Sequence, residues 1–246
     1  MPTTYDRRSF LQTVGALSAA TLFNSGYREN AALAEERDTR TNPRVAQEVV
    51  QRTYSAMCKV LVPTDFGSLP GERRNPKIGS GVLIETPPDL AEIVGPNRLV
   101  VLSVAHNFAE TPAGAEIGLK FYRGGVAQVG EEISLSARVL ASDRSFKRAD
   151  DVAFLVIDVP KDPDLAHYLK TKALPLESSE HLTQFAPVAS VGFSNTKLTP
   201  LDSLRILDSS PQSVSGNRRL LLTGFVEPGH SGAPLVNAEG RVIGVV

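Results

Sequence analysis

With 246 residues, 41% hydrophobic content and 22% charged content, the chain has the composition of a globular protein, which excludes fibrous and largely disordered classes. Its 26 Lys and Arg residues nearly balance 27 Asp and Glu residues, and the formal charge of −1 creates no overall field that would favour nucleic acid or an anionic membrane. The single cysteine, Cys58, excludes an intramolecular disulfide and a cysteine-cluster zinc site.

The first segment, residues 1–34, is predicted to be a targeting signal. Arg7 and Arg8 precede the letters "SFL" and an Ala-rich run that is short for a membrane span. This order resembles a bacterial twin-arginine export signal. The letters "ALA" at 32–34 provide the small residues that a signal peptidase needs, and the mature chain is expected to start at Glu35.

The signal predicts export to the periplasm or the extracellular space of a bacterium. The expected partners of the precursor are the twin-arginine export machinery and signal peptidase, and no lasting membrane association is expected once the signal is cleaved. The alternatives are an uncleaved membrane anchor and an ordinary cytosolic N-terminus with a chance arginine pair. Export by this route moves folded proteins, which agrees with a chain that lacks disulfides.

A polar segment follows at residues 35–52 and is predicted to end in a short amphipathic helix. Asn42 followed by Pro43 is a helix-start signal, and valines recur among polar neighbours up to about Arg52.

Short runs rich in Val, Ile and Leu make up most of the remaining chain and predict β-strands. The segments between them, such as "ETPPDLAEIVGPN", contain turn residues and predict loops. Only one further helix is predicted, over residues 162–172. This pattern indicates an all-β barrel or sandwich and excludes Rossmann and P-loop folds, whose glycine motifs are also missing. The predicted strand segments are "YSAMCKVLV", "IGSGVLIE", "RLVVLSVAH", "AEIGLKFY", "ISLSARVLA", "DVAFLVIDV", "PVASVGFS", "SLRILD", "RLLLTGFV", "APLVN" and "RVIGVV".

Two segments provide candidate acid and base groups. His106 comes directly after the apolar run "VVLSVA", at a strand end where an imidazole can be both held and exposed; a hydrogen-bonded core histidine is the alternative. Asp151 opens the apolar run "DVAFLVIDV", where a carboxylate needs a hydrogen-bond donor such as an imidazole N–H. Asp150 competes for this role, the register of the strand decides between the two, and a plain loop aspartate is the alternative.

The third segment, "EPGHSGAP", provides a candidate nucleophile. Gly229 and Gly232 flank His230 and Ser231, and glycines permit a tight turn that aims two N–H groups at one point beside a hydroxyl. An acyl-transfer nucleophile needs such an oxyanion hole and a base. The alternative is an ordinary Gly-Ser turn.

Together these segments, in the order His106, Asp151, Ser231, resemble the chymotrypsin-like or trypsin-like serine peptidases. The resemblance rests on "LSVAH", "DVAFL" and "GHSGAPLVN", and "GSGVLI" and "VASVGFS" resemble neighbouring strands of that family. It covers about residues 53–246. An α/β-hydrolase is disfavoured, because its motif is Gly-x-Ser-x-Gly and its triad order is Ser, Asp, His.

The resemblance implies two six-stranded antiparallel β-barrels with the active site between them. Residues 53–172 would form the first barrel and residues 173–246 the second. The second barrel is expected to be incomplete at its C-terminal side, with an open edge, because the family's pocket wall follows the strand "RVIGVV".

The resemblance also implies a serine endopeptidase that acts on peptide or protein substrates through an acyl-enzyme. His106 would be the general base and then the acid, Asp151 would orient it, and Ser231 would attack the substrate. The backbone N–H groups of Gly229 and Ser231 would form the oxyanion hole, and no metal or organic cofactor is required.

Two positions depart from the family pattern. His230 stands where zymogen-activated members place Asp, and activation by an ion pair with a newly cut N-terminus is therefore not expected. The primary-pocket position, six before the serine, aligns with Phe225, which argues against cleavage after Lys or Arg. The alternatives to an endopeptidase are a non-catalytic exported domain that binds peptides or a protein partner, and an esterase-like activity without peptide specificity.

Overall fold

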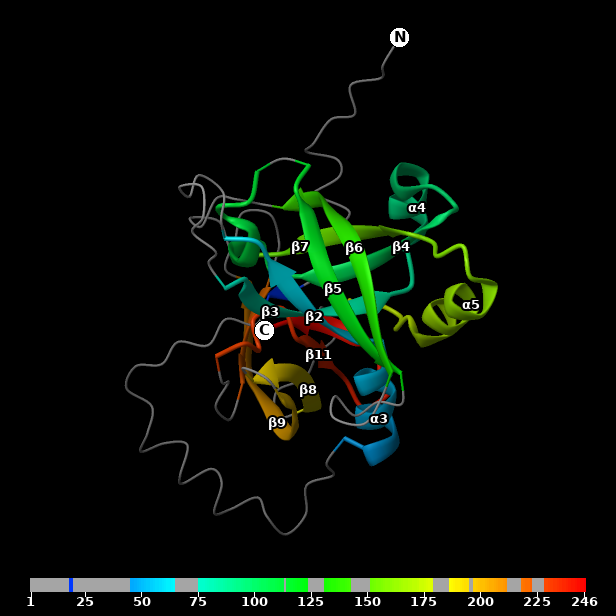
Figure 1. Ribbon diagram of the computed structural model, residues 1–246. Coiled ribbons are helices and arrows are strands. Elements are labelled where there is room, and N and C mark those ends of the chain that lie inside the picture. The colour runs from blue at the N-terminus through cyan, green and yellow to red at the C-terminus, as the bar shows by residue number, and fades with distance from the viewer. Residues whose placement is uncertain are drawn as a thin grey trace.

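The computed structural model in Figure 1 confirms that the protein is all-β, with a closed barrel, a second open sheet and a few short helices. The barrel strands occupy the upper part of the view, and β8, β9 and β11 lie below them. The structure describes residues 18–19, 45–64, 75–112, 114–123, 131–142, 151–178, 186–194, 197–211, 218–222 and 228–246.

Six antiparallel strands form the closed barrel in the order β2-β3-β4-β7-β6-β5. β5 shows how the sequence specifies such a strand, because Ile117, Leu119 and Phe121 are buried while the residues between them are more exposed. The bounds are β2 (Met57–Val62), β3 (Lys77–Ile84), β4 (Arg98–Ser103), β5 (Glu116–Arg123), β6 (Glu131–Ser142) and β7 (Ala153–Asp158).

The second sheet has the order β1-β12-β11-β8-β9-β10 and does not close within the described part of the chain. This agrees with the predicted incomplete second barrel. β1 belongs to the predicted targeting segment and runs parallel to β12. The bounds are β1 (Ser18–Ala19), β8 (Pro187–Ser194), β9 (Lys197–Pro211), β10 (Arg218–Leu222), β11 (Pro234–Val236) and β12 (Val242–Val245).

The first described helix, α3 (Gln47–Ala56), continues one turn beyond its predicted end near Arg52. Val50, Thr53 and Ala56 are buried and share one helical face, and the packed face therefore extends past Arg52. The helix packs against β8, β5 and β3 and so contacts both sheets.

The prediction missed helix α4 (Pro88–Val94), which lies in a segment predicted to be a loop. A proline is compatible with the first turn of a helix, and Gly95, with φ of 81°, ends this one. Leu90 and Val94 are one turn apart and both are buried, which explains why the short helix forms.

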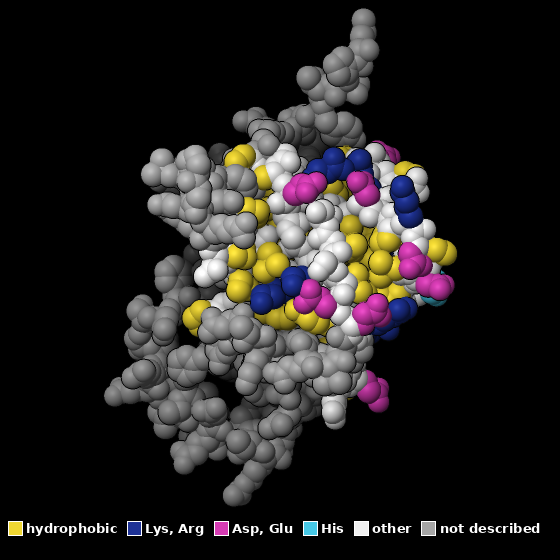
Figure 2. Space-filling model, viewed as in Figure 1, with side chains coloured by type: hydrophobic (Ala, Val, Ile, Leu, Met, Phe, Trp, Pro, Cys, Tyr) yellow, Lys and Arg dark blue, Asp and Glu magenta, His cyan; other side chains and the backbone are white. Residues whose placement is uncertain are grey.

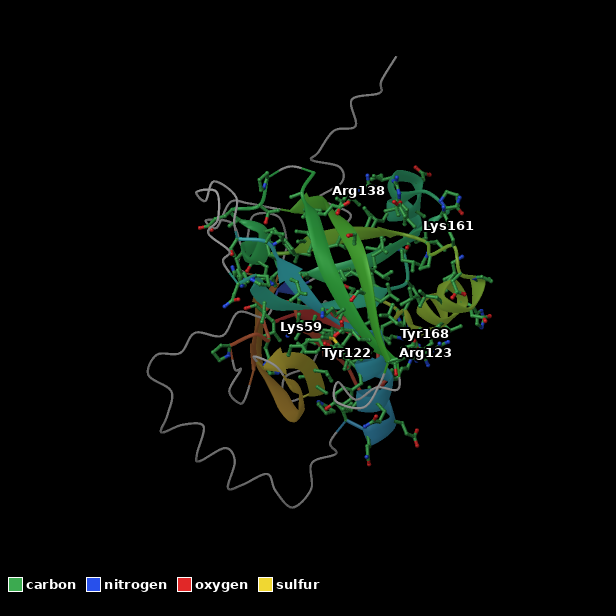
Figure 3. The ribbon with its side chains drawn as sticks, viewed as in Figure 1. Lys59, Tyr122, Arg123, Arg138, Lys161 and Tyr168 are labelled. Atoms are coloured by element: carbon green, nitrogen blue, oxygen red, sulfur yellow. The ribbon has the colours of Figure 1, made fainter. Side chains whose placement is uncertain are left out.

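Helix α5 (Pro163–Lys172) forms where a helix was predicted and lies beside the barrel. In Figure 3 the guanidinium of Arg123, on β5, lies over the ring of Tyr168, at 5.1 Å from the ring centroid. Lys172 approaches the same ring at 5.6 Å. These cation–π contacts hold the helix against the end of the barrel strand.

The outer surface of β5 and β6 carries charges of both signs, as Figure 2 shows. Lys120 pairs with Glu132 at 2.7 Å, and Arg123 pairs with Glu131 at 3.4 Å. Within the described residues, no helix is long and apolar enough to cross a membrane.

Strand β4 is buried on both faces because two hydrophobic cores meet there. Leu99 and Val101 belong to the core inside the barrel, whereas Val100 and Leu102 belong to a second core between the barrel and the other sheet. The second core also contains Phe193 of β8. A shared core therefore holds the two halves against each other, at the place where their strand ends meet.

Candidate active site

The register of two barrel strands brings His106 and Asp151 together. β4 and β7 are antiparallel with Ser103 opposite Ala153, and the end of β4 therefore lies beside the start of β7. His106 follows β4 on a single turn of 3₁₀ helix, η1 (Ala105–Phe108), and Asp151 precedes β7 by two residues.

Both carboxylate oxygens of Asp151 accept hydrogen bonds from His106. The ring nitrogen Nδ1 lies 2.5 Å from Oδ2, and the backbone N–H donates to Oδ1 at 2.7 Å. This two-point contact fixes the ring and occupies Nδ1, which leaves Nε2 as the nitrogen that can accept a proton. Asp150, the alternative partner, lies outside the described residues.

Asp151 is a partly buried carboxylate with 31% of its side chain exposed. Burial by itself raises its pKa, but the hydrogen bond and charge of the His106 ring, together with the backbone N–H groups of His106 and Ala105, lower it further than burial raises it. The net pKa of Asp151 lies below the ordinary value. The carboxylate is therefore ionised at neutral pH and can stabilise a protonated imidazole.

The loop that carries Ser231 is a tight turn that requires glycine. Gly229 and Gly232 have φ values of 101° and 89°, in the left-handed region. A Cβ atom on Gly232 would lie 2.1 Å from the carbonyl oxygen of Ser80. Inside the turn, the N–H of Ala233 donates to the carbonyl of His230 at 2.7 Å.

Two backbone N–H groups of this loop, those of Gly229 and Ser231, donate no hydrogen bond within the described part of the chain. In a planar trans peptide the N–H points opposite to the carbonyl. Because Ala233 holds the carbonyl of His230, the N–H of Ser231 is directed to the other side of that peptide. Both groups can donate to a ligand oxygen.

Ser231 contacts Asn107, the residue that follows His106. The side-chain amide of Asn107 donates to the carbonyl of Ser231 at 3.1 Å, and the N–H of Ser80 donates to the same oxygen at 2.8 Å. Among the described residues, the Ser231 hydroxyl makes no hydrogen bond to the His106 ring. Such contacts are often loose in a free enzyme and tighten when substrate binds.

His230 lies fully buried beneath the loop. Its ring packs so closely on strand β8 that a Cβ atom on Gly192 would lie 2.5 Å from Cδ2 of His230. Zymogen-activated members of the family place Asp at the position of His230. Here the position has a buried imidazole ring, which supports the turn of the Ser231 loop from the side of the second sheet.

Ser80 and Asn107 were not predicted as site residues, although both contact the loop of Ser231. Two signals in the sequence could have found them, because Ser80 lies inside "GSGVLI" and Asn107 comes directly after His106.

The predicted pocket residue Phe225 and the predicted signal residues Arg7 and Arg8 lie outside the described residues. In the part of the chain that the structure describes, no group of three or more His, Cys, Asp or Glu side chains could hold a metal ion.

The fold and site define a peptidase-like domain, with a His-Asp pair at one barrel end beside a serine between glycines. A family model described as "Trypsin-like peptidase domain" matches residues 79–245, which is more than half of the chain. The chain belongs to the trypsin-like peptidase family. A search of curated protein sequences found no match.

Solved structures show the same fold at low sequence identity. Deg5 has a TM-score of 0.56 and 16% identity, over 86% of this chain and 84% of that one. Rv3671c from M. tuberculosis H37Rv, in a mutant, inactive form, has a TM-score of 0.50 and 22% identity, over 82% of each chain. The HtrA-type protease AlgW, solved with a tripeptide, has a TM-score of 0.53 and 20% identity, over 81% of this chain and 52% of that one. The fold is therefore trypsin-like.

Proposed function

We propose that the protein is a serine endopeptidase that cleaves peptide bonds through an acyl-enzyme. The observation that carries the proposal is the two-point contact between His106 and Asp151, which leaves Nε2 free on the residue next to Asn107, whose side chain contacts the loop of Ser231. A metal or organic cofactor has no role in this mechanism.

In the proposed reaction, Nε2 of His106 takes the proton of the Ser231 hydroxyl as its oxygen attacks the scissile carbonyl carbon. Asp151 stabilises the imidazolium, and the N–H groups of Gly229 and Ser231 hold the oxyanion. The imidazolium then protonates the leaving amine as the C–N bond breaks. A water molecule then attacks the ester carbonyl carbon while it gives a proton to His106. The bond from that carbon to Oγ of Ser231 breaks, His106 returns the proton to Oγ, and the acid product leaves.

The proposed substrates are peptides or proteins, with Phe225 favouring an apolar pocket over one for Lys or Arg. We also propose export through the twin-arginine machinery to the periplasm or beyond, on the basis of Arg7, Arg8 and the small residues before Glu35. N-terminal sequencing of the protein from fractionated bacteria tests this, since cleavage by signal peptidase predicts a chain that starts at Glu35.

A direct test of the nucleophile combines a fluorophosphonate probe with hydrolysis of casein. The wild-type chain is expected to be labelled and to cleave casein, and Ser231→Ala is expected to lose both activities, because the alanine has no oxygen to attack. Ser136→Ala is the matched control, since this exposed serine lies on β6 of the barrel.

Labelling that persists in Ser231→Ala would contradict the assignment of the nucleophile. A folded wild-type chain that neither reacts with the probe nor cleaves casein would favour the alternative, a non-catalytic domain that binds peptides or a protein partner. Labelling without cleavage of casein would favour the esterase-like alternative.

A further inference from the structure

We propose that Ser80 is a positioning residue, which fixes the loop of Ser231 against the barrel. This inference deepens the proposed function, on which it rests. Ser80 lies on β3 and is fully buried. Its backbone N–H donates to the carbonyl of Ser231 at 2.8 Å, and its hydroxyl donates to the carbonyl of Gly229 at 2.8 Å.

The hydroxyl of Ser80 has a second partner in the other sheet. The N–H of Phe193, on β8, donates to Oγ of Ser80 at 2.9 Å. A serine hydroxyl has one proton and two lone pairs, and here the proton goes to Gly229 while a lone pair receives the N–H of Phe193. One side-chain atom therefore joins the barrel, the second sheet and the nucleophile loop.

A second serine holds the backbone of Ser80 in place. The hydroxyl of Ser103, at the end of β4, donates to the carbonyl of Ser80 at 2.8 Å, and Ser103 is fully buried. Ser103 precedes His106 by three residues. The segment that carries His106 is thus linked through Ser80 to the loop that carries Ser231.

These contacts fix the orientation of three consecutive peptide groups. The carbonyls of Gly229 and Ser231 accept from Ser80, and the carbonyl of His230 between them accepts from Ala233. Because each peptide is planar, fixing the three carbonyls fixes the direction of the Ser231 N–H and of its side chain. Ser80 thereby acts on the reaction through Ser231 without touching the substrate.

The backbones of β3 and the loop approach each other closely. A Cβ atom on Gly232 would lie 2.1 Å from the carbonyl oxygen of Ser80, and one on Gly79 would lie 3.2 Å from the carbonyl oxygen of Ser231. Glycine is therefore required at position 232, where a Cβ atom would meet backbone and φ is positive.

The test compares Ser80→Ala with the wild type and with the control Ser136→Ala. Removal of the hydroxyl leaves the buried N–H of Phe193 and the carbonyl of Gly229 without their partner and lets the loop shift. We expect kcat to fall by about 10²-fold, the size of effect that a misplacement of about 1 Å can have on a reaction. KM is expected to stay within about 2-fold, because Ser80 does not contact substrate and uniform binding is unchanged.

The measurements are kcat and KM with a fluorogenic peptide and the rate of fluorophosphonate labelling, on protein shown to be folded by circular dichroism. A hydroxyl that only stabilised the fold would lower the Tm and leave kcat unchanged, and that result in folded Ser80→Ala would overturn the proposal. If Ser80→Ala does not fold, Ser103→Ala replaces it, with an expected fall in kcat of about 5-fold for a displaced loop. An unchanged kcat there would also overturn the proposal.

Amide hydrogen exchange separates this proposal from the proposed function. If the folded wild type neither labels nor cleaves peptide, the proposed function fails. The positioning can still be measured, because Ser80→Ala is expected to speed exchange at the N–H of Phe193 and Gly232 and to leave that of Leu119 unchanged. Equal exchange in both proteins would overturn the positioning role.

Discussion

At the scale of single residues, the pairing of Asp151 with His106 could be predicted in part from the sequence. A carboxylate that opens a buried strand needs a donor, and this requirement pointed to an imidazole. The sequence alone could not decide whether Asp150 or Asp151 pairs with His106, because that choice depends on strand register. The pairing of Ser103 with Ala153 brings Asp151 to the backbone N–H and the ring of His106.

Asp151→Asn is expected to lower kcat by about 10⁴-fold, because an amide cannot hold the imidazole tautomer that the proposed base requires.

The Asp151→Asn substitution is also expected to change how the stability of the folded state depends on pH. The folded pKa of Asp151 is below its unfolded value, and the ionised carboxylate therefore stabilises the folded state above about pH 4. This contribution is lost as the pH falls through the lower folded pKa.

Thermal unfolding of the wild type and Asp151→Asn between pH 2 and pH 6 measures this contribution. The difference in Tm is expected to be largest at the upper end and to shrink as the carboxylate becomes protonated. A difference that stays constant over this range would contradict the assigned direction of the pKa.

At the scale of elements, most strands were predictable because they have an alternating or continuous apolar pattern. β1 was not predicted, and β9 extends on both sides of the predicted segment "SLRILD". Helix α4 was not predictable, since a run of seven residues with proline at its start also fits a loop. The burial of Leu90 and Val94, which makes the helix, comes from packing that the local letters do not show. Short helices thus depend on tertiary contacts more than on propensity.

Helix α5 provides a test of a local signal that the sequence does show. Oδ1 of Asp162 accepts from the N–H groups of Asp164 and Leu165 at 2.9 Å and 3.3 Å. Asp162→Ala is expected to lower the free energy of unfolding by about 1 kcal/mol through loss of this N-cap. Asp162→Asn keeps an acceptor and is expected to change stability little. Urea unfolding measures both, and equal losses would argue against a capping role.

At the scale of the whole molecule, the site could be predicted only as a set of residues. The contacts of Ser80 and Asn107 with the loop of Ser231 arise where the barrel meets the second sheet, and no short motif encodes that contact between the two halves. The core between the sheets contains residues of both, which predicts that they unfold together.

Phe193→Ala tests this coupling. Phe193 is fully buried in the shared core, and its ring centroid lies 5.7 Å from that of Tyr122 on the barrel. The truncation is expected to lower the free energy of unfolding by about 3 to 5 kcal/mol, with one transition in circular dichroism and tyrosine fluorescence. Two separate transitions would show that the sheets are independent. Phe193→Leu, which keeps most of the volume, is expected to cost less.

The hydrogen bond between Ser80 and Gly229 joins residues that are 149 positions apart in the chain. Closing so long a loop costs chain entropy, and folds that depend on distant pairings form slowly. We therefore expect the loop of Ser231 to reach its final orientation only after the strands on both sides have come together. The contact between His106 and Asp151 spans only 45 positions, and we expect it to form before Ser231 is in place. Under the proposed function, a partly folded copy would not yet be able to cleave its neighbours.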